Sequence, residues 1–252
     1  MSSKPIALIT GASKGIGAAV AKLFASNGFD ICINYLSDDA GARVVSHLCG
    51  SVGARTIIVK ADVSQPGEVV ELFSRCDDEL GAVSCLVNNA GIIGSLSPLE
   101  NLTAKALSET FETNVFGTLY CIQEAIKRMS TKHGGTGGTI VNMSSLAAVR
   151  GSPNEYVHYA ASKGAVETLT VGAGKELAPV GIRVNAVRVG TTDTTIHASS
   201  GNPGRVDKIA AMTPLGRIAD PIDIAEAALW LASDQSKFVT GTTVTVAGGL
   251  SA

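Results

Sequence analysis

The segment that decides the fold is Ile6-Ala7-Leu8-Ile9-Thr10-Gly11-Ala12-Ser13-Lys14-Gly15-Ile16-Gly17. An apolar run leads into a turn with three glycines, and a helical pattern follows. Because glycine has no side chain, the backbone of such a turn can approach an anionic group closely. A helix N-terminus adds free N–H groups and the positive end of the helix dipole. The spacing G-x-x-x-G-x-G differs from the standard dinucleotide pattern G-x-G-x-x-G. By itself, the segment predicts either a phosphate-binding turn or an ordinary strand-to-helix turn.

Short apolar runs alternate with longer helical patterns along most of the chain. The runs are rich in valine and isoleucine and lie at residues 6–10, 30–35, 56–60, 85–88, 140–143, 183–189 and 242–246. The helical patterns lie at residues 16–26, 40–49, 68–80, 103–129, 156–177 and 221–233. Runs that are apolar at consecutive positions are typical of strands buried on both faces of a parallel sheet. The alternation predicts an α/β Rossmann fold, with a doubly wound, mainly parallel seven-stranded sheet and helices on both faces.

No change in composition marks an interdomain linker, so residues 1–252 are expected to form a single domain. Chains of this length with α/β patterning commonly do so. Residues 191–214 lack a clear strand pattern and indicate a long loop with room for one short helix. Long ordered loops often serve a site, so we expect this segment to be a substrate lid that excludes water.

Composition narrows the classes of function. Hydrophobic residues make up 45% of the 252 positions, and the formal net charge is −2. That balance gives no basic face for nucleic acid or an acidic membrane surface, and no run approaches the roughly 20 apolar residues of a membrane helix. The five cysteines are irregularly spaced, which favours buried thiols in a reducing compartment over disulfides or a metal site. We therefore expect a cytoplasmic protein with a small-molecule partner and no metal.

A second motif, Tyr159-Ala160-Ala161-Ser162-Lys163, places a phenol and an ammonium four residues apart. On a helix these two side chains share one face. A free tyrosine has a pKa near ~10, and a nearby ammonium favours the phenolate and lowers that pKa. Tyr159 could then give a proton to a carbonyl oxygen or take one from an alcohol. The pair predicts an acid–base device.

Together these motifs resemble the short-chain dehydrogenase/reductase family. The resemblance covers nearly the whole chain in order and is greatest to bacterial 3-oxoacyl-carrier-protein reductases and glucose dehydrogenases. The matching motifs are the glycine turn, Asp62-Val63, Asn88-Asn89-Ala90-Gly91, Asn114 within T-N-V-F-G, Ser145, and Tyr159 with Lys163. One departure is Val189-Gly190, where the family usually has Pro-Gly, which leaves this turn less constrained.

The resemblance implies a catalytic group of Asn114, Ser145, Tyr159 and Lys163. Ser145 would hydrogen-bond the substrate oxygen, Lys163 would reach the nicotinamide ribose, and Asn114 would hold a water that connects Lys163 to solvent. Tyr159 lies fourteen positions after Ser145, one more than is usual in the family, so the adjacent Ser144 remains an alternative.

The resemblance also implies a set of cofactor-binding residues. They comprise Gly11, Ser13, Lys14, Gly15, Ile16, Gly17, Tyr35, Ser37, Asp62, Val63, Asn89, Ala90, Gly91, Tyr159, Lys163, Gly190, Thr192 and Thr194.

The end of the second predicted strand bears on the choice of nicotinamide cofactor. An acidic residue there would bind the adenosine ribose diol of NAD and repel a 2′-phosphate. This chain has Tyr35 at that position, while Lys14 and Ser37 could meet a 2′-phosphate. We therefore expect NADP in preference to NAD. A slightly longer strand would instead bring Asp38 or Asp39 to the ribose and favour NAD.

The leading hypothesis is an NADP-dependent oxidoreductase that interconverts a ketone and a secondary alcohol, with Tyr159 as general acid and base. One alternative is an NAD-dependent alcohol or sugar dehydrogenase. Another is a catalytically weak nucleotide-binding regulatory protein on the same fold. Similar proteins assemble as dimers or tetramers, so a homo-oligomer is expected.

Overall fold

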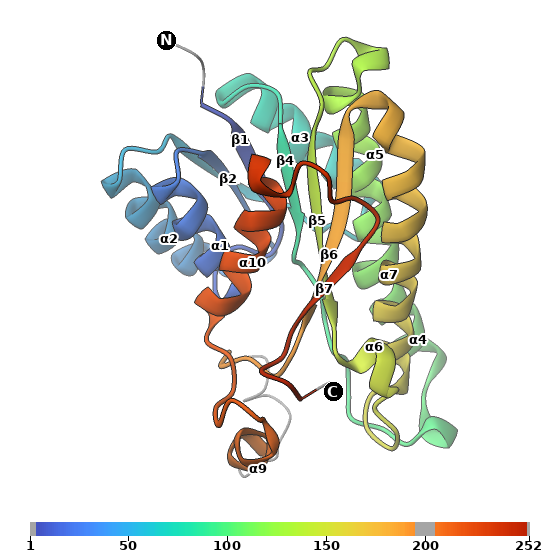
Figure 1. Ribbon diagram of the computed structural model, residues 1–252. Coiled ribbons are helices and arrows are strands. Elements are labelled where there is room, and N and C mark those ends of the chain that lie inside the picture. Colours follow the sequence, from blue (N-terminus) through green and yellow to red (C-terminus); the bar gives the residue numbers. More distant parts are fainter. Residues whose placement is uncertain (1–3, 195–204, 251–252) are drawn as a thin grey trace.

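A computed structural model describes residues 4–194 and 205–250. Its centre is one seven-stranded sheet in the order β3-β2-β1-β4-β5-β6-β7, and every neighbouring pair is parallel (Figure 1). The strands are β1 (Ile6–Ile9), β2 (Asp30–Tyr35), β3 (Thr56–Lys60), β4 (Cys85–Asn88), β5 (Gly138–Ser145), β6 (Ile182–Val189) and β7 (Thr243–Val246). This arrangement confirms the doubly wound Rossmann fold predicted from the strand–helix alternation.

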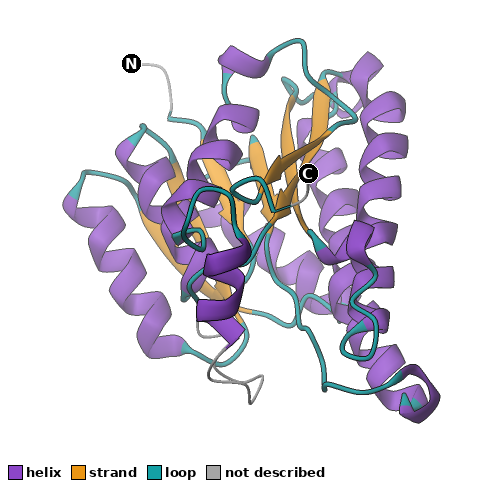
Figure 2. Ribbon diagram, turned by 60° about the horizontal axis from the view of Figure 1, so that its bottom comes forward, coloured by secondary structure: helices purple, strands orange, loops and turns teal. Residues whose placement is uncertain are grey.

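Helices cover both faces of the sheet (Figures 1 and 2). One face carries α1 (Gly15–Ser26), α2 (Asp39–Ser51) and α10 (Pro221–Ala232), and the other carries α3 (Pro66–Glu79), α5 (Gly117–Met129) and α7 (Val157–Leu177). The shorter helices are α4 (Ala104–Phe111), α6 (Ala147–Arg150) and α9 (Arg205–Met212). Among the described helices, none is long and apolar enough to cross a membrane.

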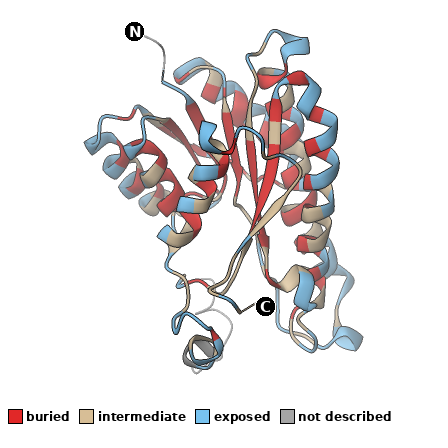
Figure 3. Ribbon diagram, viewed as in Figure 1, coloured by how far each residue is buried: buried red, intermediate tan, exposed pale blue. Residues whose placement is uncertain are grey.

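Two hydrophobic clusters form the core, one on each side of the sheet (Figure 3). Ile9, Ile31 and Phe24 lie in the cluster under α1, α2 and α10. Leu8 and Phe73 lie in the cluster under α3, α5 and α7. Neighbouring residues Leu8 and Ile9 thus point to opposite sides, as strand geometry requires. Strands β1, β2 and β4 are buried along their whole length, which explains why most of their residues are apolar. All five cysteines are buried as expected.

The strand order places a topological switch point between β1 and β4. From β1 the chain moves outward through β2 and β3, and from β4 it moves outward in the opposite direction. The connections therefore separate at the carboxyl ends of these two strands and leave a crevice there. This geometry directs the glycine turn after β1 and the Asn88-Asn89-Ala90-Gly91 segment after β4 to the same place.

The prediction of one uninterrupted helix over residues 103–129 is wrong in one respect. The structure divides it into α4, a π-helical turn (Glu112–Phe116) and α5. A Cβ added at Gly117 would lie 2.9 Å from Val63 Cγ2, so the helix approaches the segment after β3 closely at this point. π-Helical turns accommodate such local constraints and often occur at functional sites.

The structure describes only part of the predicted lid over residues 191–214. Its described end contains α9, and Thr192 forms an isolated parallel bridge with Ala219. Residues 195–204 lie outside the described part of the chain. Sequence patterns did not predict α6, which follows β5 directly and is a single turn.

Candidate active site

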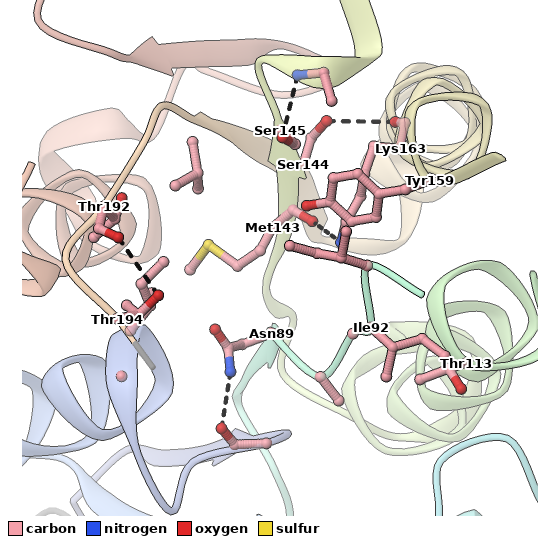
Figure 4. A pocket seen from close by; sticks show the side chains of 18 of the residues that line it. Asn89, Ile92, Thr113, Met143, Ser144, Ser145, Tyr159, Lys163, Thr192 and Thr194 are labelled. Atoms are coloured by element: carbon pink, nitrogen blue, oxygen red, sulfur yellow. Dashed lines mark hydrogen bonds between the residues drawn. The ribbon is translucent and has the colours of Figure 1, made fainter. Parts of the chain in front are cut away.

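A cavity of about 1550 Å³ opens at the carboxyl ends of the central strands. Its walls come from the glycine turn, the ends of β2, β4, β5 and β6, the first turns of α7, and α9. Figure 4 shows side chains from these separate elements turned toward a common space. The site predicted from scattered motifs is thus one place in the folded chain.

The glycine turn is constrained by its backbone conformation and by close packing. Gly11 has φ +62° and Gly15 has φ +56°, conformations that favour glycine. A Cβ added at Gly17 would lie 2.5 Å from both the Gly11 carbonyl oxygen and Asn89 Nδ2. Lys14, at the N-cap of α1, makes no side-chain capping hydrogen bond. The first turn of α1 can therefore offer its backbone N–H groups to an anion in the cavity.

Polar side chains hold this turn against the neighbouring strands. Thr10 Oγ1 accepts hydrogen bonds from the backbone N–H groups of Asn89 and Ala90, each at 3.0 Å. Asn89 Nδ2 donates to the carbonyl oxygens of Thr10 at 2.9 Å and Gly11 at 3.0 Å. Asn34 Oδ1 accepts from the Gly11 N–H at 3.2 Å. The turn is thus pre-organised by β2 and β4 as well as by its own glycines.

Most residues predicted to bind the cofactor line the cavity. These are Gly11, Ser13, Lys14, Gly15, Ile16, Ser37, Asp62, Val63, Asn89, Ala90, Gly91, Tyr159, Lys163, Gly190, Thr192 and Thr194. Gly17 contributes by letting α1 approach the turn. A cavity of this size fits a dinucleotide. The N-terminus of α1 lies beside it, and only glycines allow that helix to approach the turn so closely.

Tyr35 differs, because it is not among the described residues that line the cavity. Its hydroxyl donates to Asp39 Oδ1 at 2.6 Å, and the described residues that line the cavity at this point are Asn34, Leu36, Ser37 and Asp38. Successive side chains of a strand point to opposite faces, so the residues on either side of Tyr35 face the cavity. Sequence reasoning missed Asn34, whose signal was a polar residue at the end of an apolar strand.

Both acidic alternatives at this strand end have partners within the protein. Asp38 is the N-cap of α2 and accepts a hydrogen bond from the Gly41 N–H at 3.0 Å. Asp39 forms an ion pair with Arg43 at 2.6 Å, and the hydrogen bond from Arg43 holds the pKa of the Asp39 carboxyl below its usual value. Asp38 lines the cavity and Asp39 is turned toward its own helix.

Tyr159, Lys163 and Ser145 meet at the inner end of the cavity (Figure 4). Lys163 Nζ donates to the Met143 carbonyl oxygen of β5 at 2.8 Å and lies 5.8 Å from the centroid of the Tyr159 ring. The Ser145 hydroxyl lies near enough to the Tyr159 phenol to lower its pKa. The helix α7 and the strand β5 therefore bring a phenol, an ammonium and a hydroxyl together.

Burial sets the protonation of the phenol and the ammonium. It raises the pKa of Tyr159 above its usual value, although the hydrogen bond with Ser145 acts in the opposite direction. It lowers the pKa of Lys163 to about 8. The sequence predicted that Lys163 would lower the pKa of Tyr159. The net shift is upward, because removal of the phenolate from water outweighs stabilisation of its charge.

The structure distinguishes the two adjacent serines. Ser144 is buried, and its hydroxyl donates to Glu167 Oε1 of α7 at 2.8 Å. Ser145 Oγ accepts from the Ala147 N–H at 3.2 Å, and its hydroxyl lowers the pKa of the nearby Tyr159 phenol. Ser145 is thus the serine placed to act with the phenol.

Asn114 lies within the π-helical turn and is fully buried. Its amide accepts from the Ile92 N–H at 2.8 Å and donates to the Ile92 carbonyl at 2.9 Å and to Ser162 Oγ at 3.0 Å. A Cβ added at Gly91 would lie 3.1 Å from Asn114 Oδ1 and 3.4 Å from Lys163 Nζ. Asn114 therefore clamps the segment after β4 beside Lys163. Its water-holding role stays a prediction.

Fold and site together define an oxidoreductase of the Rossmann type, and comparison with known proteins gives its family. Residues 11–251 match the family described as Enoyl-(Acyl carrier protein) reductase, a branch of the short-chain dehydrogenases/reductases. The chain belongs to the short-chain dehydrogenase/reductase family, which confirms the resemblance seen in the sequence.

Individual relatives span almost the whole chain. The uncharacterized oxidoreductase YgfF of Escherichia coli strain K12 is 46% identical over 97% of this chain and 99% of its own length. The cis-4-hydroxycyclohexanecarboxylate dehydrogenase of Sinomonas cyclohexanicum is 38% identical over 98% of this chain and 96% of its own. The solved structure of a short-chain dehydrogenase/reductase from Serratia marcescens BCRC 10948 superposes with a TM-score of 0.90, at 29% identity and 99% coverage of both chains.

Proposed function

We propose that this protein is an NADP-dependent oxidoreductase that interconverts a ketone and a secondary alcohol. The observation that carries the proposal is the convergence of Tyr159, Ser145 and Lys163 in the same cavity as the glycine turn. A regulatory protein that only bound nucleotide would have no need for a half-buried phenol beside a buried ammonium.

The side chains divide the work on the substrate oxygen. Tyr159 donates its phenolic proton to the carbonyl oxygen during reduction, and Ser145 donates a hydrogen bond to that oxygen as negative charge develops. A bound nicotinamide cofactor supplies the hydride chemistry. Because burial raises the pKa of Tyr159, the protonated phenol needed for reduction is the populated form at neutral pH. Lys163 contributes a positive charge next to the phenol and is held by the Met143 carbonyl.

The residues around the end of β2 favour NADP over NAD. Lys14 is exposed and, like Ser37, lines the cavity, so the two can meet a 2′-phosphate. Asp39, which would oppose a 2′-phosphate, is paired with Arg43. Asp38 lines the cavity and is the observation that favours the NAD-dependent alternative.

The substrate end of the cavity has apolar side chains in its wall beside polar and charged ones. Ile92, Leu146, Ile209 and Met212 belong to this wall, which suits the carbon skeleton of a medium-sized ketone. A relative is named for a hydroxycyclohexanecarboxylate. We therefore include 4-oxocyclohexanecarboxylate among the first substrates to test, beside the 3-oxoester ethyl acetoacetate.

The first experiment is a titration of the purified protein with NADPH and with NADH, followed by nicotinamide fluorescence. Tighter binding of NADPH supports the assignment of Lys14 and Ser37, and tighter binding of NADH assigns the ribose to Asp38. Ketone reduction is then measured with the preferred cofactor. Cofactor binding without turnover of any ketone would favour the regulatory alternative.

We also propose that the protein is cytoplasmic and forms a homo-oligomer. Leu107, Phe116 and Val171 are exposed apolar residues on α4, the π-helical turn and α7, and the Phe238 side chain is fully exposed. Such surfaces are commonly covered in assemblies. Sedimentation velocity across a range of concentrations tests this, and a monomer throughout that range would contradict it.

A further inference from the structure

A row of polar side chains crosses three neighbouring strands behind the active site. Ser144 of β5 is paired in register with Arg188 of β6, and Arg188 is paired with Thr245 of β7. Directly paired residues of adjacent strands project to the same side of a sheet. Here that side is the one covered by α7, because Ser144 and Arg188 both contact Glu167 of that helix.

Glu167 joins the row to α7. Arg188 donates to Glu167 through Nε at 2.8 Å and Nη2 at 2.6 Å, which is a two-pronged contact with both carboxylate oxygens. The Ser144 hydroxyl donates to Glu167 Oε1 at 2.8 Å, and Arg188 Nη1 also donates to Thr245 Oγ1 at 3.2 Å. Side-chain exposure is 21% for Arg188 and 15% for Glu167, so the pair is largely shielded from water. Bidentate charged contacts of this kind are geometrically specific.

The spacing along α7 connects this contact to the reactive groups. Tyr159, Lys163 and Glu167 follow one another at intervals of four residues and therefore share one face of the helix. Lys163 is held to β5 by the Met143 carbonyl, and its own carbonyl lies 3.3 Å from the Ser144 hydroxyl. The ion pair thus lies one helical turn beyond Lys163.

The interface between α7 and the sheet is unusually polar. Besides the contacts of Lys163 and Glu167, Thr170 Oγ1 accepts from Asn142 Nδ2 of β5 at 2.9 Å. Thr170 and Lys163 are buried, whereas a helix that packs on a sheet commonly presents a continuous apolar stripe. An apolar interface tolerates small slides, but directional hydrogen bonds between shielded groups have one good geometry.

We propose that Glu167 and Arg188 are positioning residues that fix the register of α7 against β5 and β6, and so hold Tyr159 and Lys163 in reactive geometry beside Ser145. The proposal rests on the proposed function for its catalytic consequence. Neither residue needs to touch substrate or cofactor. Loss of the pair lets α7 shift against the strand that carries Ser145, and displacements of about 1 Å can lower a rate by up to about a hundredfold.

The test compares Glu167→Gln with a matched control, Glu124→Gln. Glu124 also forms a shielded ion pair, with Arg128 at 2.8 Å and side-chain exposures of 8% and 15%, but both residues lie on α5 and neither lines the cavity. We expect both variants to lose similar thermal stability. Glu167→Gln should lower kcat at least about tenfold with little change in the KM for NADPH, whereas Glu124→Gln should keep the wild-type kcat.

Two further readouts separate positioning from general destabilisation. Arg188→Lys retains the charge and should recover part of the kcat lost in Arg188→Met. Ultraviolet difference titration of the Tyr159 phenol, measured against Tyr159→Phe, needs no substrate. The phenol pKa should shift in Glu167→Gln and stay unchanged in Glu124→Gln, because only the first changes the surroundings of Tyr159.

The outcomes decide the proposal independently of the proposed function. If Glu167→Gln matches Glu124→Gln in kcat and in the phenol titration, the positioning role is refuted. If wild-type protein reduces neither 4-oxocyclohexanecarboxylate nor ethyl acetoacetate, or if Tyr159→Phe remains active, the proposed function fails. The phenol titration then still shows whether Glu167 sets the surroundings of Tyr159.

Discussion

Replacement of Gly17 by alanine tests whether close packing of the glycine turn creates the cofactor site. The added Cβ would lie 2.5 Å from the Gly11 carbonyl oxygen, 2.5 Å from Asn89 Nδ2 and 2.9 Å from Ala12 Cα. Two of these three atoms are backbone, so the start of α1 must move as a unit. Overpacking of this kind costs about 1–3 kcal/mol. The displaced first turn of α1 should also weaken NADPH binding at least about tenfold, which corresponds to about 1.4 kcal/mol.

Gly172→Ala provides the matched control for this substitution. Gly172 lies within α7, and a Cβ added there meets nothing within 4 Å. Alanine in a helix interior is favoured over glycine by roughly 0.5–1 kcal/mol, so the control should gain stability and keep its NADPH affinity.

Urea denaturation and fluorescence titration measure the two effects in the same preparations. We expect the unfolding midpoints of Gly17→Ala and Gly172→Ala to move in opposite directions from wild type. If Gly17→Ala unfolds like wild type and binds NADPH equally well, α1 accommodates the methyl group and the close approach of its N-terminus does not create the site.

Three further predictions follow from the site. Tyr159→Phe should bind NADPH normally and lose roughly 10²–10⁴-fold in kcat, because the general acid is absent. Turnover at the wild-type rate in a stopped-flow reduction assay would contradict this role of Tyr159. Burial lowers the pKa of Lys163 to about 8, below the ordinary lysine value near ~10.5. Between these two pH values the unfolded chain binds more protons than the folded protein, so the stability of the fold rises with pH. The destabilisation due to the buried ammonium is therefore full below about pH 8 and is relieved as pH rises through that window. Lys163→Met should lack this rise in stability with pH. If the melting temperatures of wild type and Lys163→Met differ by the same amount at every pH, the lowered pKa of Lys163 is refuted. Lys14→Gln should weaken NADPH binding about tenfold with NADH binding unchanged, because a charged contact to the 2′-phosphate is lost. Lys22→Gln, within α1 but not among the described residues that line the cavity, should change neither affinity.

The sequence was sufficient for the parts of this protein that depend on local chemistry. The glycines of the turn and the four-residue interval between Tyr159 and Lys163 carry their meaning in short segments, since backbone freedom and helical periodicity act over a few residues. Strand–helix alternation predicted the parallel sheet for the same reason. Once that topology is known, the carboxyl ends of β1 and β4 must meet, and most of the predicted cofactor residues line one cavity.

Other features depend on which face a side chain occupies. Tyr35 was assigned to the cofactor because of its place in the sequence, but the phase of β2 turns it toward Asp39 and turns Asn34 toward the glycine turn. The choice between Ser144 and Ser145 has the same origin, because Ser144 donates to Glu167 and Ser145 is the serine beside the Tyr159 phenol. A shift of one residue in a strand reverses both outcomes, and a short apolar run does not specify its phase.

What the sequence by itself determined is the fold class, the glycine turn and the Tyr159–Lys163 pair, because each follows from local backbone preferences and from hydrophobic periodicity. What only the tertiary structure decided is the direction in which Tyr35 and Ser145 point, the pKa shifts of Tyr159 and Lys163, and the contact between Glu167 and Arg188. These depend on burial and on the pairing of residues distant in the chain. For Ser145, Tyr159, Lys163 and the Glu167–Arg188 contact they are set by how α7 packs on β5 and β6, and for Tyr35 by the phase of β2 against α2. No local pattern encodes that packing.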